Sequence, residues 1–272
     1  MVTASELRRI GQGREAEIFL WGDGAVLKLY RHEAYVQSRA HEAAAMNAAK
    51  SAGAPAPGAL DFVEVDGRPG LVMERVEGID LLTAFGNKPW TVFAMSRAMG
   101  VAHAQLHAVQ APAELPRIKE AAAHRMRTSP LIPEALRAVG VAALERLPQG
   151  DRLCHGDFHP GNVIINDSVV RVIDWPNAFA GDPDADVTRT LLTLRIGDPP
   201  AGTTPAAMRA LIGVGRRIMI SFYQRGYRSV RPFDARRVER DWMLPVAIYR
   251  LQDDIEDERP KLLKLIEQLR TT

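Results

Sequence analysis

Three side chains with oxygen atoms follow one another closely in the middle of this chain. Asp157 and Asn162 lie five positions apart, and Asp174 comes twelve positions after Asn162. Carboxylate and amide oxygens are ligands that suit Mg²⁺, with phosphate oxygens and water completing its octahedron. A carboxylate can also orient a hydroxyl group or receive its proton. These residue types therefore indicate metal-assisted chemistry on a phosphate compound.

The spacing of Asp157 and Asn162 matches the protein-kinase catalytic loop, H-x-D-x-x-x-x-N. In that loop the Asp orients or deprotonates the acceptor hydroxyl, and the Asn holds Mg²⁺. Two apolar runs, 163–165 and 169–173, separate Asn162 from Asp174 and flank a turn at 166–168. This pattern predicts a β-hairpin. Because a hairpin brings its two ends together, Asn162 and Asp174 should meet.

The first third of the chain must supply the groups that hold a phosphate compound against these residues. Alternating apolar residues and turn residues predict strands at 7–10, 16–21, 25–30, 60–65 and 71–76. An alanine-rich segment at 32–52, which ends at Gly53 with prolines beyond, predicts a helix after the third strand. The predicted order is therefore β-β-β-α-β-β.

Gly11 and Gly13 lie between the first two predicted strands. A hairpin with glycines can lie over phosphates, because missing side chains let backbone N–H groups approach. A plain β-turn is the alternative. The same residues match the loose dinucleotide-binding pattern G-x-G-x-x-A, but that pattern must open a helix and a strand follows here. No P-loop sequence, G-x-x-x-x-G-K-[ST], occurs in the chain.

Lys28 lies on the third predicted strand and should point to the face opposite Leu27 and Leu29. A lysine on this strand and a glutamate on the next helix match the protein-kinase pair that contacts the phosphates. Glu42 is the predicted partner of Lys28, and Glu33, nearer the helix start, is the competing acid.

The end of the fifth predicted strand could contact a nucleotide base. Glu74 and Val76 lie there, shortly before Gly78. A strand edge at this point would expose backbone C=O and N–H groups to an adenine ring, so we predict contacts through these two residues.

Each of several further polar residues has both a structural and a functional interpretation. His103 and His107 lie four apart on a predicted helix at 92–109, as a metal-binding pair would. No third ligand is evident, so packing roles are expected. His155 should support the catalytic loop rather than act as a base. Asp186 begins another predicted helix, where it could cap that helix or accept N–H bonds from the catalytic loop.

Together these residues resemble the aminoglycoside phosphotransferase family, which includes choline-kinase-like enzymes. The resemblance covers roughly residues 7–194. It rests on His155-Gly156-Asp157 with Asn162, on Ile173-Asp174-Trp175, and on Gly181-Asp182-Pro183 with Asp186. It implies an α+β, bilobal protein-kinase-like fold. Residues 1–76 would form a small nucleotide-binding lobe with a five-stranded antiparallel sheet and one helix, and residues 77–272 a larger, mainly helical lobe with the catalytic loop and acceptor site.

The resemblance also implies site roles. ATP would bind between the lobes, with GTP as the alternative donor. The implied roles are a catalytic base at Asp157, Mg²⁺ ligands at Asn162 and Asp174, a phosphate contact at Lys28, its support at Glu42, and a brace for the catalytic loop at Asp186. The expected activity is Mg²⁺-dependent phosphorylation of a small-molecule hydroxyl, such as that of an aminoglycoside-like compound, amino alcohol or sugar.

Departures from protein kinases favour a small acceptor. Asp174 is followed by Trp175 and Pro176, no A-P-E occurs downstream, and only about ten residues precede the next predicted helix. That is too few for a long protein-binding activation loop. A nucleotide-binding module without catalysis and a protein kinase are the alternative interpretations.

Composition and charge restrict the partners. The net charge of +2 does not indicate a nucleic-acid partner, and no apolar run reaches the roughly 18 residues of a membrane span. Residues 1–13 lack a signal-type apolar core, and the single cysteine suits a reducing compartment, so a cytoplasmic protein is expected. Further helices are predicted at 121–127, 133–147, 206–225, 234–257 and 261–269. An acidic cluster at 253–258 is either a solvated face or a negative rim that attracts a cationic acceptor.

Overall fold

The structure of the protein is a computed structural model. It describes residues 3–13, 15–32, 36–166, 169–197 and 206–271, and for 36–38 and 206–212 it describes the backbone alone. Two sequence-based expectations fall outside the described residues: the acid Glu33 and part of the turn at 166–168.

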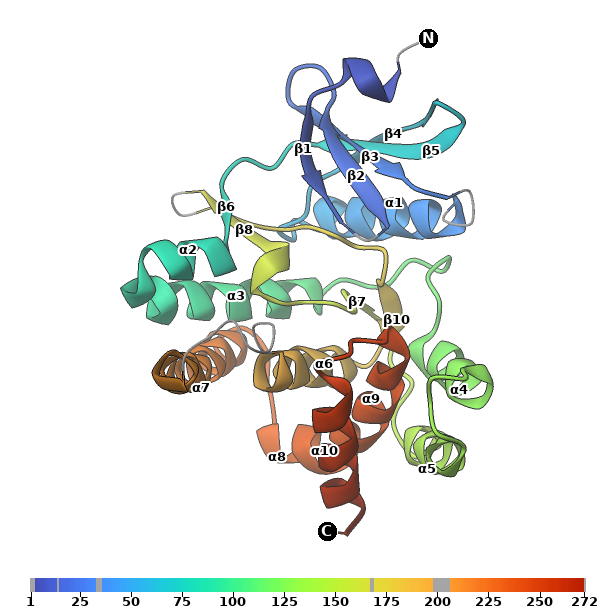
Figure 1. The fold of residues 1–272 in the computed structure, drawn as a ribbon, viewed down its shortest axis with the longest axis vertical. Coiled ribbons are helices and arrows are strands. Elements are labelled where there is room, and N and C mark those ends of the chain that lie inside the picture. The colour runs from blue at the N-terminus through green and yellow to red at the C-terminus, as the bar shows by residue number, and fades with distance from the viewer. Residues whose placement is uncertain (1–2, 14, 33–35, 167–168, 198–205, 272) are drawn as a thin grey trace.

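A five-stranded antiparallel sheet forms the N-terminal part of the fold (Figure 1). Its strands lie in the order β1-β2-β3-β5-β4 and comprise β1 (Arg9–Gln12), β2 (Ala16–Leu20), β3 (Ala25–Tyr30), β4 (Ala59–Val65) and β5 (Arg68–Glu74). Helix α1 (Val36–Ser51) follows β3. The predicted order β-β-β-α-β-β and the small antiparallel lobe with one helix are confirmed.

The central strand β3 is buried on both faces, and its alternation decides where Lys28 points. Leu27 and Leu29 belong to a small apolar cluster with Val72 of β5. Val26 and Tyr30 belong to a separate cluster that includes Met46 of α1. Lys28 therefore lies on the α1 face, as the strand pattern predicts.

The rest of the chain is mostly helical and lies below the sheet in Figure 1. Its helices are α2 (Leu81–Asn87), α3 (Val92–Leu106), α4 (Ile118–Thr128), α5 (Glu134–Glu145), α6 (Pro183–Ile196), α7 (Ala206–Arg228), α8 (Ala235–Arg237), α9 (Met243–Arg250) and α10 (Arg259–Thr271). The fold is thus bilobal and protein-kinase-like, of the α+β class. Within the described ranges no helix is both long and apolar enough to cross a bilayer.

Short strands in the second lobe position the predicted loop residues. Strand β7 (Arg152–Cys154) pairs with β10 (Phe179–Gly181), and β8 (Val163–Asn166) pairs with β6 (Ile79–Asp80) and β9 (Val169–Val172), all antiparallel. The predicted hairpin after Asn162 is confirmed as β8 and β9. At its open end Ile173 N–H donates to the Asn162 carbonyl at 2.9 Å, so Asn162 and Asp174 lie beside each other.

Glycines allow α3 and α7 to approach closely. A Cβ at Gly100 of α3 would collide with the Tyr223 carbonyl, and a Cβ at Gly226 of α7 would collide with the Arg97 carbonyl. Only glycine fits at either point without moving a helix. This close packing brings Tyr223 of α7 within reach of side chains on α3.

The predicted helix at 234–257 is wrong as a single element. The chain forms α8, a π-helical turn at Val238–Trp242 and then α9, and a 3₁₀ turn ends before Asp254, which has a φ of 52°. Pro245 removes one helical N–H donor just after the π-helical turn, where an altered hydrogen-bond pattern is tolerated. A left-handed residue at Asp254 then stops the helix.

Candidate active site

Lys28 joins the sheet to the hairpin of the second lobe. Its Nζ lies 2.8 Å from Glu42 Oε1 and 2.7 Å from Asp174 Oδ1. Glu42 is fully buried and also accepts the Tyr30 hydroxyl at 2.6 Å and Trp175 N–H at 3.2 Å. Burial alone would lower the pKa of Lys28, but the Glu42 and Asp174 carboxylates outweigh it and raise that pKa. Lys28 is therefore a fixed positive charge.

The catalytic loop begins where β7 ends, at a turn that requires glycine. Gly156 has a φ of 79°, and a Cβ there would collide with the Asn177 carbonyl. The buried His155 ring donates from Nε2 to the Ile173 carbonyl at 3.0 Å and accepts Asp157 N–H at Nδ1. Burial lowers the pKa of His155, which suits this neutral tautomer. The ring thus ties the loop to the far end of the hairpin.

Asp157 presents a carboxylate into the space beside this loop. Burial would raise its pKa, but the nearby His159 ring and the Arg189 guanidinium hold that pKa below its usual range. His159 Nε2 lies 3.5 Å from Asp157 Oδ2. An ionised carboxylate only accepts hydrogen bonds, so Asp157 can receive one from an acceptor hydroxyl.

Asn162 and Asp174 form a fitting pair for Mg²⁺. Asn162 Nδ2 donates to the Asp157 carbonyl at 3.0 Å, which leaves its amide oxygen as the side-chain acceptor. Asp174 has a φ of 67°, and its side chain is 47% exposed. A carboxylate and an amide oxygen at adjacent points are the hard ligands that Mg²⁺ takes. The donor set therefore fits this ion.

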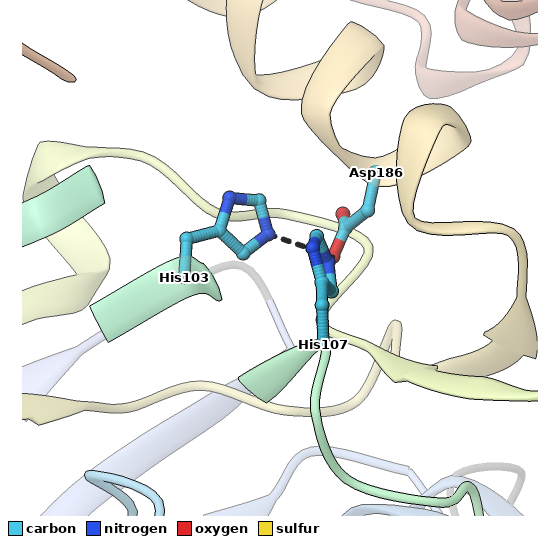
Figure 2. A group of neighbouring side chains, drawn as sticks. All are labelled: His103, His107 and Asp186. Atoms are coloured by element: carbon cyan, nitrogen blue, oxygen red, sulfur yellow. Dashed lines mark hydrogen bonds and ion pairs between the residues drawn. The ribbon is translucent and has the colours of Figure 1, made fainter. Parts of the chain in front are cut away.

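A buried carboxylate anchors the loop from below. Asp186, near the start of α6, accepts His155 N–H at 2.6 Å and Gly156 N–H at 3.0 Å. Figure 2 shows the His103 side chain, from α3, and the His107 side chain, from the C-cap of that helix, reaching toward it. Their Nε2 atoms lie 3.0 and 3.3 Å from Asp186 Oδ2. The loop contacts predicted for Asp186 are present, while the capping role belongs to Asp182, which accepts Asp184 N–H.

Two tyrosines of α7 complete this anchor, which we call the Tyr-His ladder. The Tyr223 hydroxyl lies 2.8 Å from His103 Nδ1, and the Tyr227 hydroxyl lies 2.6 Å from His107 Nδ1. Because the Asp186 carboxylate can only accept, each histidine donates through Nε2 and each tyrosine donates to Nδ1. The ladder thus connects α7 through α3 to the residues before Asp157.

The expectation that His103 and His107 lack a third ligand is wrong, because Asp186 lies with them in a group of atoms all within 4.8 Å of one another. Every one of these atoms is, however, already hydrogen-bonded. Burial and the neighbouring His107 lower the pKa of His103 to about 3, and Asp186 has a pKa well below its usual value. Hydrogen bonds from both rings to one buried carboxylate account for the cluster, so the packing interpretation is retained.

The first hairpin has enough space for a side chain at Gly11 and at Gly13. A Cβ at Gly11 would lie 3.7 Å from Ile18, and one at Gly13 would lie 3.8 Å from the Ala16 carbonyl, both ordinary contacts. Gly13 N–H donates to that carbonyl at 2.8 Å and closes the turn. Packing within the described residues therefore does not by itself require glycine at either position.

The end of β5 has a different geometry from the one expected for Glu74. Its side chain pairs with Lys50 and accepts Gly58 N–H at 2.9 Å, so it faces the α1 side. Its own N–H donates to the Gly58 carbonyl at 2.9 Å. The predicted base contact therefore reduces to the Glu74 carbonyl and the backbone of half-buried Val76.

A cavity of about 1060 Å³ opens beside the catalytic loop. Asp157, His159 and Arg189 line it, together with residues of other helices, among them α4, α7 and α9, and of the segment after α9. The described lining residues include Glu15 and His41 of the N-terminal lobe but not Lys28 or Asp174. Sequence reasoning missed Arg189, Tyr223 and Tyr227, although the tyrosines repeat the four-residue spacing of the histidines.

Comparisons with known proteins agree with the fold described above. A sequence model of the phosphotransferase enzyme family matches residues 6–233. The match extends past residue 194, where the expected resemblance ended, and includes α7. No curated protein is significantly similar to the chain in sequence.

Solved structures share the fold at low sequence identity. A thermostable mutant of aminoglycoside phosphotransferase APH(4)-Ia, in ternary complex with AMP-PNP and hygromycin B, aligns over 97% of this chain and 93% of its own, with 17% identity and a TM-score of 0.64. A choline/ethanolamine kinase family protein from Mesorhizobium loti aligns over 97% and 87%, with 20% identity and a TM-score of 0.63. Amicoumacin kinase hAmiN, in complex with AMP-PNP, Ca²⁺ and Ami, aligns over 99% and 89%, with 15% identity and a TM-score of 0.64.

Proposed function

This chain belongs to the phosphotransferase enzyme family, and we propose that it transfers the γ-phosphate of ATP to a hydroxyl of a small molecule. The observation that carries the proposal is the junction of the two lobes, where Lys28 of β3 bonds Asp174 at the end of the hairpin. Asn162 lies beside Asp174 and holds the Asp157 carbonyl. This geometry supports the proposal, because an ammonium group lies beside two oxygen ligands that suit Mg²⁺, and Asn162 links them to the loop that carries Asp157.

In this proposal the acceptor oxygen forms a bond to the γ-phosphorus while the bond to the bridging oxygen of ADP breaks. Asp157 orients the hydroxyl and receives its proton, and ADP leaves. Asn162 and Asp174 would hold Mg²⁺, which neutralises charge on the phosphates when bound. Positioning and fixed charges contribute most of the rate in such reactions. His155 and Asp186 position the loop without contacting the reacting atoms.

We further propose that residues 1–76 bind the nucleotide and that the second lobe begins at residue 77. Lys28, held by Glu42, contacts the phosphates, and the hairpin with Gly11 and Gly13 covers them. The base lies against the backbone of Glu74 and Val76. ATP is the proposed donor and GTP the alternative, and a nucleotide-dependent enzyme of this kind would act in the cytoplasm.

The acceptor is a small molecule in this account. Only residues 175–182 separate Asp174 from α6, and strand β10 occupies part of that interval. A segment this short cannot form the long loop on which a protein substrate would rest. Two of the similar structures named above contain hygromycin B or Ami beside a nucleotide analogue, which supports a compound of similar size.

A screen for phosphorylated products tests the proposal. The protein is incubated with ATP, Mg²⁺ and a library of amines, sugars, alcohols and hydroxy acids, and phosphate esters are detected by mass spectrometry. At least one small hydroxyl compound should gain a phosphate, only when Mg²⁺ is present. Nucleotide binding without transfer to any acceptor would favour the non-catalytic module, and labelling of lysate proteins alone would favour a protein kinase.

A further inference from the structure

Helix α6 holds the catalytic loop on both sides of Asp157. Asp186 of this helix accepts the N–H groups of the two residues before Asp157, at 2.6 and 3.0 Å. The Thr190 hydroxyl donates to the carbonyl of the residue after Asp157 at 2.8 Å. Arg189 lies three positions after Asp186 and so shares a helix face with it. Burial would raise the pKa of Asp157, but the His159 ring and the Arg189 guanidinium hold it below its usual range, so Arg189 acts on the base from nearby.

The charge of Arg189 is already matched. Its Nη2 lies 2.8 Å from Asp253 Oδ2, and Arg250 lies 3.3 Å from the same oxygen. Arg250 in turn donates two hydrogen bonds to Glu258, at 2.8 and 3.1 Å. We call these four residues the arginine-carboxylate wall, in which two positive charges meet two negative ones. The negative rim considered from sequence is therefore wrong for Asp253 and Glu258.

The cavity beside the wall has no surplus of either charge. The other acids of the segment after α9, Asp254, Glu256 and Asp257, are exposed and are not among the described residues that line the cavity. Among those lining residues, four arginines are matched by four carboxylates. Net charge therefore favours neither a cationic nor an anionic acceptor, and selection falls to hydrogen bonds.

Arg189 has hydrogen-bond donors to spare at this cavity, which it lines together with Asp157. A guanidinium group has five N–H donors, and within the described residues Arg189 has one hydrogen-bond partner, Asp253. Its side chain is only 11% exposed, and its Nε is buried without a partner in that part of the chain. Buried donors without acceptors cost free energy. Because Asp253 already matches the charge, a neutral oxygen is enough to satisfy these donors, whereas an ammonium group cannot accept from them.

We propose that Arg189 is a specificity-determining residue, which donates to a second, neutral oxygen of the acceptor while Asp157 receives the reacting hydroxyl. The acceptor is then a compound with two neighbouring oxygens, such as a diol or polyol, and not one with an ammonium group beside the hydroxyl. Its carbon skeleton lies against α9, where Pro245, Val246 and Tyr249 line the cavity, as apolar side chains do in small-molecule sites. This inference rests on the proposed phosphotransfer and specifies its substrate class.

Ring alcohols on one carbon skeleton test the preference. Cyclohexanol, 2-aminocyclohexanol and cyclohexane-1,2-diol are compared, the last two as their cis and trans forms. Binding is measured by NMR titration with the magnesium complex of a non-hydrolysable ATP analogue present. One form of the diol should bind at least about tenfold more tightly than cyclohexanol and than either amine, as a hydrogen bond to a charged group can provide. Equal or tighter binding of cyclohexanol or of an amine, or no binding of the diol, would overturn the inference.

Arg189→Met assigns the preference to this residue. Methionine keeps an unbranched apolar stem and removes the donors, and Asp253 keeps Arg250 as its partner. The diol should lose about tenfold in affinity, while the affinities for cyclohexanol and for the nucleotide analogue stay the same. A merely structural role would weaken the diol and cyclohexanol alike, and that result would contradict the assignment.

Arg195→Met is the matched control on the same helix. Arg195 pairs with Glu239 and is not among the described residues that line the cavity. Its substitution also removes an ion pair, but it should leave diol binding unchanged, and an equal loss of affinity in the control would count against Arg189. Phosphate transfer that favours amines would sink this inference and leave phosphotransfer standing. No transfer to any member of the acceptor library would count against phosphotransfer itself.

Discussion

Lys28 Nζ lies 2.7 Å from Asp174 Oδ1, although 146 residues separate the two in sequence. The contact joins the central strand of the N-terminal sheet to the end of the hairpin in the helical lobe. Glu42 holds the other side of the same ammonium group. The lobes therefore meet through a charged junction at the point where phosphates would be bound. The same ion pair holds the lobes together and forms part of the candidate site.

Asp174→Asn should weaken nucleotide binding in the presence of Mg²⁺ at least about tenfold, because a neutral amide replaces a charged metal ligand. Asparagine tolerates the left-handed backbone at this position, so the fold should survive. Calorimetric titration with and without Mg²⁺ measures the change. Asp257→Asn, in the exposed acidic segment, serves as control, and equal Mg²⁺ dependence in both variants would remove Asp174 from the metal site.

The acidic limb of the pH–rate profile should depend on His159. Asp157 has a pKa below its usual range, partly through this neighbour, so its ionised form persists into more acidic solution. Substituting His159→Gln takes away the hydrogen bond from the imidazole ring and should raise the pKa of Asp157. The acidic limb of kcat/KM would then move to higher pH. A limb that stays in place would show that His159 does not act on the base.

Tyr227→Phe should lower the free energy of unfolding by about 1–3 kcal/mol, because the buried Nδ1 of His107 loses its donor. The same substitution should reduce kcat more than it changes the KM for ATP, since the Tyr-His ladder supports the catalytic loop and not the nucleotide. Denaturant unfolding and steady-state kinetics measure the two effects. An equally large change in kcat and in the KM for ATP would show that the Tyr-His ladder has a purely structural role.

Stability should fall in mildly acidic solution. The pKa of His103 is lowered to about 3 in the fold by burial and by His107, against 6.5 for an ordinary histidine. At these pH values the unfolded chain therefore binds a proton at His103, and the folded chain does not. The contribution of His103 to the free energy of unfolding is fully present above about pH 6.5 and is lost progressively as the pH falls toward 3. Replacing His103 with Gln should flatten the unfolding free energy in this range, and an unchanged slope would contradict the assignment.

Local patterns were sufficient for the elements that carry the chemistry. The alternation around Lys28 placed it on the correct face of β3, and the turn between two apolar runs placed Asn162 next to Asp174. Each inference needed only a period of two and the geometry of a hairpin. The spacing from Asp157 to Asn162 is likewise contained in one loop.

Contacts between segments that are distant in the sequence could not be predicted from such local patterns. Tyr223 and Tyr227 meet the histidines because Gly100 and Gly226 let α3 and α7 approach, and this pairing has no local signal. The charges of Asp253 and Glu258 looked solvent-exposed in sequence, yet arginines on other helices neutralise them. The charge of the cavity wall depends on such contacts, which local sequence patterns do not contain.

Asp157→Asn offers the most direct test of phosphotransfer at this site. Phosphate transfer to the best acceptor from the screen and nucleotide affinity are measured on the same preparation. Asparagine keeps the shape but cannot take the proton, so turnover should fall about 10²- to 10⁴-fold, while the affinity for the magnesium–nucleotide complex stays within about twofold, because Asp157 meets the acceptor and not the nucleotide. Turnover equal to that of the unaltered protein would contradict the account.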